Sequence, residues 1–416
     1  MELKCKINGE EVTLRAEPTA RLRDVLYRAG YRSVRDSDDA EGFAGSDTIV
    51  FNGKLKYANF ILFYQAEGAE IRTAESLLNG RELNNVQKAM VAAGIVQSAY
   101  NAPAAALILT WLLEQKPNPT REEIKDVLTS IFIRDAGYEH YYLAVKLATE
   151  LRDFGEFRSE IAPSFRPNLE VVGKPCGKID GAALVSGEPV FVEDKVPENA
   201  WCLHVLRSPF ASAYIKSIDT SEAEKLPGVA AILTAYNTPE THYMQAGQGN
   251  PEPSPHDRRL FNRKVRHVGD RVAGIIARTP EIADQAAALI KVEYEPQGAV
   301  YTVEEAMAEG APVLHEEHPD NVLAKMDLRT PMPGSDFHSV EDVLACPAYY
   351  QFRGRYDTQQ VQHCHIENPI SYAWMEGGRI VVVTSTQIPH IVRRVIGQAM
   401  GIGWGSIRVI KPYIGG

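Results

Sequence analysis

The sequence has few cysteines, and no two of them stand at the short spacing of a metal site. The five cysteines of this 416-residue chain are Cys5, Cys176, Cys202, Cys346 and Cys364. A zinc site typically uses CxxC pairs, and a disulfide framework needs an even set, so both are excluded. We expect these residues to be small core side chains of a protein in the reducing cytoplasm.

Long apolar segments and basic runs are also missing. No stretch reaches the roughly 18 apolar residues of a membrane-spanning helix, and no apolar run behind a charged start indicates a signal peptide. The net charge of −10 disfavours nucleic acid and membrane surfaces as partners, because both are anionic. The content of 44% hydrophobic and 24% charged residues is typical of a globular protein, and the length suggests roughly three domains.

The first part of the chain has the pattern of a small β-rich domain. Alternating apolar residues on both sides of Asn8-Gly9 predict a β-hairpin. A helix is expected over residues 21–29, and further strands over residues 48–51 and 60–64. Strand, strand, helix, strand is the order of a β-grasp domain, which we place at residues 1–77.

Helical patterns follow in residues 78–152. Helices are expected over residues 83–96, 104–113 and 138–151, and Thr120 with Glu123 forms a capping box that starts another. Four helices with short turns predict a four-helix bundle. Residues 153–172 contain Pro163 and Pro167, which indicates a linker.

The remainder mixes strands and helices, so the fold class expected for the chain is a multidomain α+β protein. One α+β domain is placed at residues 173–310, with strand, helix and strand over 271–277, 281–290 and 291–295. A last domain is placed at residues 311–416. Long alternating strands are expected from Tyr349 onward, then a helix over 390–400 and a strand over 407–410. The last expected strand runs into Gly415 and Gly416, and we interpret this point as lying inside a fold rather than at its natural end.

Several motifs make the chain resemble the xanthine dehydrogenase and aldehyde oxidase family. They are Arg207–Ala213, Leu226–Val229, Val268–Ala273, Thr386–Pro389 and Pro412–Gly416. The resemblance implies a ferredoxin-like β-grasp domain, a helical second 2Fe–2S domain, an α/β hammerhead domain and the beginning of a molybdopterin-binding domain. Fusion of the front domains to the molybdenum part without a flavin domain is similar to the bacterial selenium-dependent xanthine dehydrogenase-like branch.

The front domains depart from that family at the cluster ligands. The family's cysteine positions fall on Asp39, Ala44, Asp47, Asn59, Ser98, Asn101, Ile133 and Asp135. None is a cysteine, and carboxylates and amides are poor ligands for a sulfide-bridged iron cluster. We therefore predict that the chain holds no iron–sulfur cluster.

Four other residues carry the family's contacts with the molybdenum cofactor. The resemblance gives Gln97 a role at the polar edge of the pterin and Gln387 a role beside an oxygen ligand of the metal. Gly415 and Gly416 match the first glycines of a loop whose backbone approaches the cofactor. The alternatives are that Gln97 caps a helix end and that Gln387 bonds local backbone in a turn.

Two clusters of polar residues contain possible metal ligands, and we interpret both as ordinary polar surface. His363, His365 and Glu367 alternate along an expected strand, so a facial metal site is conceivable, yet a polar strip on a sheet is the favoured reading. Asp36, Asp38, Asp39 and Glu41 lack the spacing of a calcium loop and read as a solvated acidic turn.

The family's activity, hydroxylation by a pyranopterin-bound molybdenum with a glutamate as general base, implies the function. That glutamate lies beyond the family region matched here, so we expect no catalytic residue in this chain and no turnover by it alone. The expected protein is the N-terminal part of a molybdenum hydroxylase acting on purines, related heterocycles or aldehydes. It would be completed by the remaining cofactor-binding half, in the same gene or a separate chain, and possibly served by a separate FAD subunit, without FAD in this chain. The alternative is a non-catalytic binding or scaffold subunit, or a truncated gene product; sequence beyond Gly416 would decide.

Overall fold

The computed structural model describes residues 1–37, 42–97, 100–131, 136–150, 168–170, 172, 178–244, 256–325, 334 and 337–415. These residues form two compact units. The first comprises residues 1–197, 363–389 and 408–416, and the second comprises residues 198–362 and 390–407. Within the described ranges, no helix combines the length and the apolar character that crossing a membrane requires.

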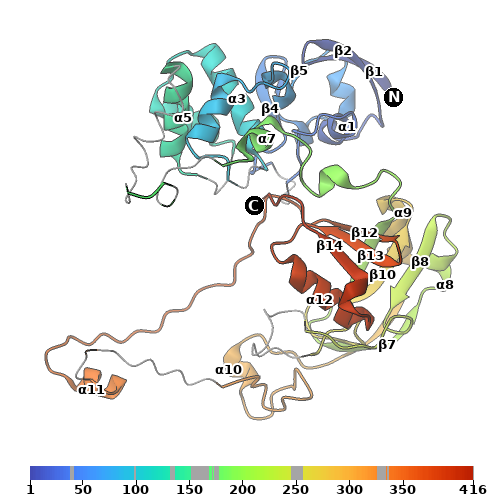
Figure 1. Ribbon diagram of the computed structural model, residues 1–416. Helices are drawn as coiled ribbons and strands as arrows, with labels where there is room; N and C mark the ends of the chain where they lie inside the picture. Colours follow the sequence, from blue (N-terminus) through green and yellow to red (C-terminus); the bar gives the residue numbers. More distant parts are fainter. Residues whose placement is uncertain are drawn as a thin grey trace. The chain divides into compact units, whose positions relative to one another are not determined.

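The first unit begins with a β-grasp sheet and one helix (Figure 1). The sheet order is β2-β1-β5-β3-β4, and only β1 and β5 pair in parallel. The bounds are β1 Glu2–Ile7, β2 Glu10–Arg15, α1 Leu22–Arg28, β3 Thr48–Phe51, β4 Lys54–Tyr57 and β5 Glu70–Arg72. Short 3-10 turns lie at η1 Ala58–Phe60, η2 Phe63–Ala66 and η3 Ala74–Leu77.

The expected hairpin at Asn8-Gly9 is confirmed. Both residues have positive φ, +52° and +92°, which is the geometry of a two-residue hairpin turn that suits asparagine and glycine. The register pairs Ile7 with Glu10, so Leu3, Cys5 and Ile7 point to one side. That side is buried against Leu22 and Leu26 of α1, and the period-2 pattern thus selects the core face of the sheet.

The strand expected over residues 60–64 is wrong. Ile61 and Phe63 are buried as a strand pattern would require. However, Ile61 directly follows η1, Phe63 begins η2, and only a single bridge joins Leu62 to Arg21. Burial in short turns mimics the alternation of a strand, so the pattern alone could not separate the two. The strands β4 and β5, of four and three residues, were not predicted.

Four helices follow within the described residues, as expected. Their bounds are α2 Asn85–Ala92, α3 Ala102–Gln115, α4 Arg121–Leu128 and α5 Tyr138–Glu150. Asn84 and Gln87 form a capping box at α2, and Thr120 and Glu123 form the predicted one at α4. Helix α3 is buried along most of its length, because Ala and Leu cover nearly its whole surface and it lies within the core of the bundle.

The same unit contains two further segments. Helix α7 (Gly181–Ser186) packs on α2 and α3, and η4 (Glu193–Lys195) follows it. Strands β12 (Ser371–Glu376), β13 (Arg379–Thr384) and β14 (Ile407–Ile410) form an antiparallel β12-β13 pair with β14 beside β13. The predictions of strands at residues 379–384 and 407–410 are confirmed.

The second unit contains two small sheets with helices against one of them. The sheet orders are β6-β10-β8 and β11-β7-β9, and α9 packs on β6 and β10. The strands are β6 Cys202–Arg207, β7 Ala213–Asp219, β8 Val229–Thr234, β9 Lys264–Val265, β10 Arg271–Ala277 and β11 Lys291–Pro296. The helices are α8 Ser221–Glu224, α9 Pro280–Leu289, α10 Val303–Ala306, α11 Val340–Ala345 and α12 Pro389–Met400, followed by η5 Trp404–Ser406. The strand, helix and strand expected over residues 271–295 are confirmed.

The long strands expected from Tyr349 onward are wrong up to residue 370. Residues 350–365 have no regular secondary structure, and the first strand after them is β12. A strand needs a neighbour for its backbone groups, and residues 350–361 have none among the described residues. The linker expected at residues 153–172 lies outside the described residues, except for residues 168–170 and 172.

Candidate functional site

The positions aligned with the first cluster form a network of hydrogen bonds. Asp47 precedes β3 and Asn59 lies in η1, and the Asp47 carboxylate accepts a hydrogen bond from the backbone N–H of Asn59 at 2.8 Å. The Asn59 amide donates to Asp36 Oδ1 at 3.0 Å, and Arg21 donates to the other oxygen of Asp36 at 3.2 Å. Two of the four aligned positions are therefore adjacent, and Asn59 also connects them to Asp36.

Burial affects the protonation of the Asp47 carboxyl. Asp47 is fully buried, and desolvation raises its pKa to about 6, although the hydrogen bond from Asn59 lowers it. Ala44 is also buried and offers only a methyl group. Gly45 is held at φ +65°, where a Cβ would lie 2.3 Å from the Ser130 backbone oxygen. The fourth aligned position, Asp39, lies outside the described residues.

Only Asn101 of the second cluster's aligned positions is described. It precedes α3 and is completely buried, and neither its amide nitrogen nor its oxygen has a hydrogen-bond partner among the described residues. Ser98, Ile133 and Asp135 lie outside them. A buried side-chain amide without partners costs free energy.

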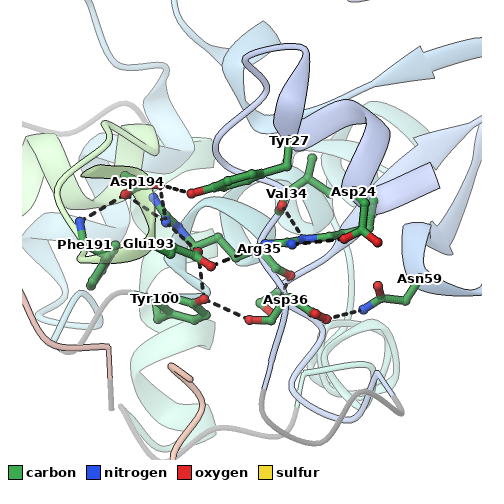
Figure 2. Close-up of polar contacts among 12 residues, drawn as sticks. Asp24, Tyr27, Val34, Arg35, Asp36, Asn59, Tyr100, Phe191, Glu193 and Asp194 are labelled. Carbon is green, nitrogen blue, oxygen red and sulfur yellow. Dashed lines mark hydrogen bonds and ion pairs between the residues drawn. The ribbon is translucent and has the colours of Figure 1, made fainter. Parts of the chain in front are cut away.

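A second group of charges lies beside the first (Figure 2). The Arg35 guanidinium is fully buried and donates to both carboxylate oxygens of Asp194, at 3.0 and 3.1 Å, and to Glu193 at 3.2 Å. Arg23 donates to the other oxygen of Glu193 at 3.5 Å. Two arginines thus balance two carboxylates from η4, which is what allows these charges to be buried.

Two tyrosines complete this group. The hydroxyl of Tyr27 donates to Asp194 at 2.8 Å. The hydroxyl of Tyr100 lies 2.8 Å from both Glu193 Oε1 and the backbone oxygen of Asp36, so its one proton serves one of them at a time. Burial, with the charge of Glu193, raises the pKa of Tyr100 well above its ordinary value, so it remains a neutral donor.

Sequence reasoning missed this second group. Arg35 stands 158 and 159 residues before its two carboxylate partners, so no local spacing connects them. The neighbouring loop is fixed by Ser46, which accepts from the Arg35 N–H through its backbone oxygen and donates to the Arg35 backbone oxygen through its hydroxyl. We find no signal in the single sequence that would have identified these residues.

Glu367 connects the group to the glycine end of the chain. Its Oε2 accepts a hydrogen bond from the backbone N–H of Gly415 at 2.6 Å, and its Oε1 is buried without a partner among the described residues. Burial raises the pKa of Glu367 to about 7, with Glu193 and Asp194 also raising it and Arg35 lowering it. This carboxyl therefore titrates near neutral pH.

Gly415 lies directly against Tyr100. A Cβ built on Gly415 would stand 2.5 Å from Tyr100 Cδ2, so only glycine fits at this place. The other predicted glycine, Gly416, lies outside the described residues.

The two predicted glutamines are both exposed. Gln97 lies in the turn between α2 and α3, five residues beyond the end of α2, and its carbonyl accepts a hydrogen bond from the Lys178 ammonium. Gln387 lies in the bend between β13 and α12. The contacts of the described residues do not bring the two glutamines together.

The alternating strand expected for His363, His365 and Glu367 is wrong. Cys364 has φ +51°, which breaks an extended conformation, and the two imidazoles stack with centroids 5.5 Å apart in an exposed segment. Glu367 is buried instead, against the group around Arg35. Among the described residues, no three His, Cys, Asp or Glu side chains are placed to hold a metal ion.

Three segments of the chain match known protein families. Residues 73–146 match the 2Fe-2S binding domain, residues 186–298 match the aldehyde oxidase and xanthine dehydrogenase a/b hammerhead domain, and residues 314–416 match the molybdopterin cofactor-binding domain. The group around Arg35 thus lies partly before and partly inside these matches.

Relatives match over the whole chain or its second part. The protein named probable hypoxanthine oxidase XdhD of Escherichia coli K12 is 42% identical over 99% of this chain and 46% of its own length. The xanthine dehydrogenase molybdenum-binding subunit of E. coli O157:H7 is 39% identical over 58% of this chain and 31% of its own. The aldehyde oxidoreductase of Desulfovibrio desulfuricans has the same fold, with a TM-score of 0.84 at 24% identity, covering 100% of this chain and 46% of that chain. The chain therefore spans about half the length of relatives that match it throughout.

Proposed function

Because the chain belongs to the xanthine dehydrogenase and aldehyde oxidase family, we propose that it forms the N-terminal part of a molybdenum-cofactor-dependent hydroxylase. Its substrates are purines, related heterocycles or aldehydes. The relative that carries the name of a hypoxanthine oxidase favours purines among these. The activity belongs to the completed protein, since no catalytic residue is assigned to this chain.

The observation that carries the proposal is the placement of Gly415. Gly415 is packed on Tyr100 and held by Glu367 in the part of the chain that matches the molybdopterin cofactor-binding domain. A molybdopterin cofactor, when bound, supplies the metal that transfers oxygen to the substrate. Because a Cβ at Gly415 would meet Tyr100, glycine fixes the course of this loop in the matched region, and the proposal gives the loop's backbone the approach to the ligand.

Four residues are proposed to contact the cofactor. Gln97 and Gln387 have exposed side chains that can reach a ligand, and their amides can each donate and accept. Gly415 shapes the loop rather than donating to the cofactor, since its N–H is already donated to Glu367. The proposal gives Gly416 the role of bringing its backbone close to the cofactor. The catalytic base of the completed protein is assigned to the remaining half.

We further propose that no iron–sulfur cluster is bound. The described residues at the aligned positions do not fit one, because Asp47 and Asn59 bond each other, Ala44 has no donor atom and Asn101 is an amide. Iron in sulfide-bridged clusters is held by thiolates. Electrons from the substrate then leave by a route that does not pass through residues 1–152.

The proposal includes partners and a compartment. The remaining cofactor-binding half, from the same gene or as a separate chain, completes the enzyme, and an FAD subunit accepts electrons as a separate chain. The domains are assigned to residues 1–77, 78–152, 173–310 and 311–416. The protein is placed in the cytoplasm, since the four described cysteines are free thiols.

A second candidate function is a non-catalytic scaffold. It is favoured by the balanced group around Arg35, which joins three separate parts of the first unit. In that case the chain binds a partner without supporting turnover.

Metal analysis of the completed protein separates the two. We expect molybdenum near one per chain and iron at background, with hydroxylation of hypoxanthine that is lost in Gln387→Ala. The matched control is Gln115→Ala, an exposed glutamine at the end of α3 and outside the proposed site. Absence of molybdenum from a purified, folded complex would reject the enzyme and leave the scaffold.

A further inference from the structure

Residues 350–361, here called the arm, run in extended form after α11 (Figure 1). Their backbone makes no hydrogen bond to any residue in the described part of the chain. Backbone N–H and C=O groups are obligatory hydrogen-bonding groups, and an extended segment satisfies them with water or with a neighbouring strand.

The side chains of the arm favour a neighbouring strand. Tyr350, Phe352 and Tyr356 stand at even positions, and each is more than 90% exposed. Gln351, Arg353 and Arg355 stand at the odd positions between them. In an extended chain these two sets point to opposite faces, so one face is aromatic and the other polar. Such a strand typically has one face on a core.

The described structure does not cover the aromatic face. Each aromatic side chain would bury about 150–250 Å² in a core, and a contiguous exposed patch of this size marks an interaction site. The polar face, by contrast, has contacts with residues outside the arm, because Arg355 pairs with Glu304 and the Gln351 amide donates to the Leu344 backbone oxygen. The aromatic face has no such contact among the described residues.

The relatives indicate where the partner comes from. The arm lies within the residues that match the molybdopterin cofactor-binding domain, and the chain spans only 46% of the length of the relative that matches it throughout. A domain whose strand lacks a neighbour in one half finds that neighbour in the other half. We propose that the arm adds as a β-strand to a sheet edge of the remaining half of the molybdenum protein, with Tyr350, Phe352 and Tyr356 buried beneath it.

This inference rests on the proposed function only in assuming that a completing half exists.

The test uses two polypeptides. One is the full chain, and the other is the part of the E. coli relative named probable hypoxanthine oxidase that lies beyond the region matched by this chain. Hydrogen exchange of peptides covering residues 349–362 is measured in the chain alone and in the isolated complex. We expect rapid exchange in the chain alone and exchange slowed at least tenfold in the complex.

Two sets of variants make the test specific. Replacing Tyr350, Phe352 and Tyr356 by serine should weaken the complex at least tenfold. The control replaces Tyr301, Val303 and Met307 by serine, which are comparably exposed in the same unit, and should leave it unchanged. Arg353→Pro and Gly354→Pro remove neighbouring N–H groups that point to opposite edges of a strand, so at least one should weaken the complex. Neither removes a hydrogen bond from the described chain.

The outcomes separate the arm from the proposed function. A stable complex in which residues 350–361 still exchange rapidly overturns the role of the arm and leaves the proposed function standing. Absence of any complex counts against both. Protection of the arm in the chain alone that grows with its concentration identifies a second copy as the occupant and also overturns the inference.

Discussion

The carboxylate of Glu367 accepts a hydrogen bond from the backbone N–H of Gly415 at 2.6 Å, across 48 residues of sequence. This bond fixes the glycine end of the chain against Tyr100, and Tyr100 in turn lies beside Glu193 and Asp36. The proposed cofactor loop therefore reaches Asp36 and Glu193 through the packing of Gly415 on Tyr100 and the hydrogen bonds of the Tyr100 hydroxyl.

Stability of the first unit should fall as Glu367 loses its proton. Its pKa is raised to about 7 in the folded chain from 4.5, so the folded state binds the proton more tightly than the unfolded state. The resulting stabilisation is complete below about pH 4.5 and is lost as the pH rises through about 7. One pKa unit corresponds to about 1.4 kcal/mol, so the wild type should lose on the order of 3 kcal/mol of unfolding free energy over this range through Glu367. Glu367→Gln has no proton to lose at this position and should not show this loss.

Hydrogen exchange of peptides from α2 and α3, followed from pH 4.5 to 8 and corrected for intrinsic rates, measures this effect. The exposed Glu309→Gln is the control and should follow the wild type. Parallel curves for Glu367→Gln and the wild type would contradict a raised pKa.

Gly415→Ala should displace the glycine end of the chain. The added methyl group would stand 2.5 Å from Tyr100 Cδ2, so the loop or the ring must move, at a cost of about 1–3 kcal/mol. Faster hydrogen exchange over residues 408–415 is the expected readout. Gly403→Ala is the matched control, because nothing lies within 4 Å of its added Cβ and its φ of −65° suits alanine. Equal behaviour of the two variants would count against the close packing.

Arg35→Met should destabilise the first unit by about 3–5 kcal/mol, because it leaves Glu193 and Asp194 buried with too little positive charge. Adding Glu193→Gln and Asp194→Asn should recover part of the loss. Arg121→Met, which breaks an exposed pair with Glu139, should change stability by no more than about 1 kcal/mol. Urea unfolding followed by hydrogen exchange in α3 measures all of these variants, and a small effect of Arg35→Met would show that the charges are solvated.

The sequence predicted those parts of the fold that depend on neighbouring residues. The Asn8-Gly9 turn and the Thr120–Glu123 capping box are local, since a positive φ or a cap depends on residues a few positions apart. The contact of Gly415 with Tyr100, by contrast, was not predicted.

What the sequence could not predict depends on distant partners. Glu367 was considered only as a conceivable metal ligand on a strand, whereas its neighbours are Gly415 and the group around Arg35. The alternation from Tyr349 to residue 365 resembles a strand because its faces differ in polarity, yet pairing requires a neighbour that the described residues do not supply. Periodicity reports which face is apolar and not whether a partner is present.

Restoring the thiolates should restore a cluster if the backbone has kept its ligand spacing. Asp39→Cys, Ala44→Cys, Asp47→Cys and Asn59→Cys together recreate C-x4-C-x2-C and the distant cysteine. We expect this variant to take up iron and sulfide on anaerobic reconstitution and to absorb visible light. The control with Asp39 left unchanged, which lacks one thiolate, should take up less. A folded variant that takes up nothing would show that the loop has lost the cluster geometry as well as the sulfur.

We propose that the hydrogen bonds of Asn59 with Asp47 and Asp36 take the place of a cluster. Iron and acid-labile sulfide analysis of the natural protein, after anaerobic reconstitution, tests it most directly. We predict both at the level of a protein-free control and no visible absorption band. Stoichiometric iron and sulfide with a sulfide-to-iron absorption band would contradict the account.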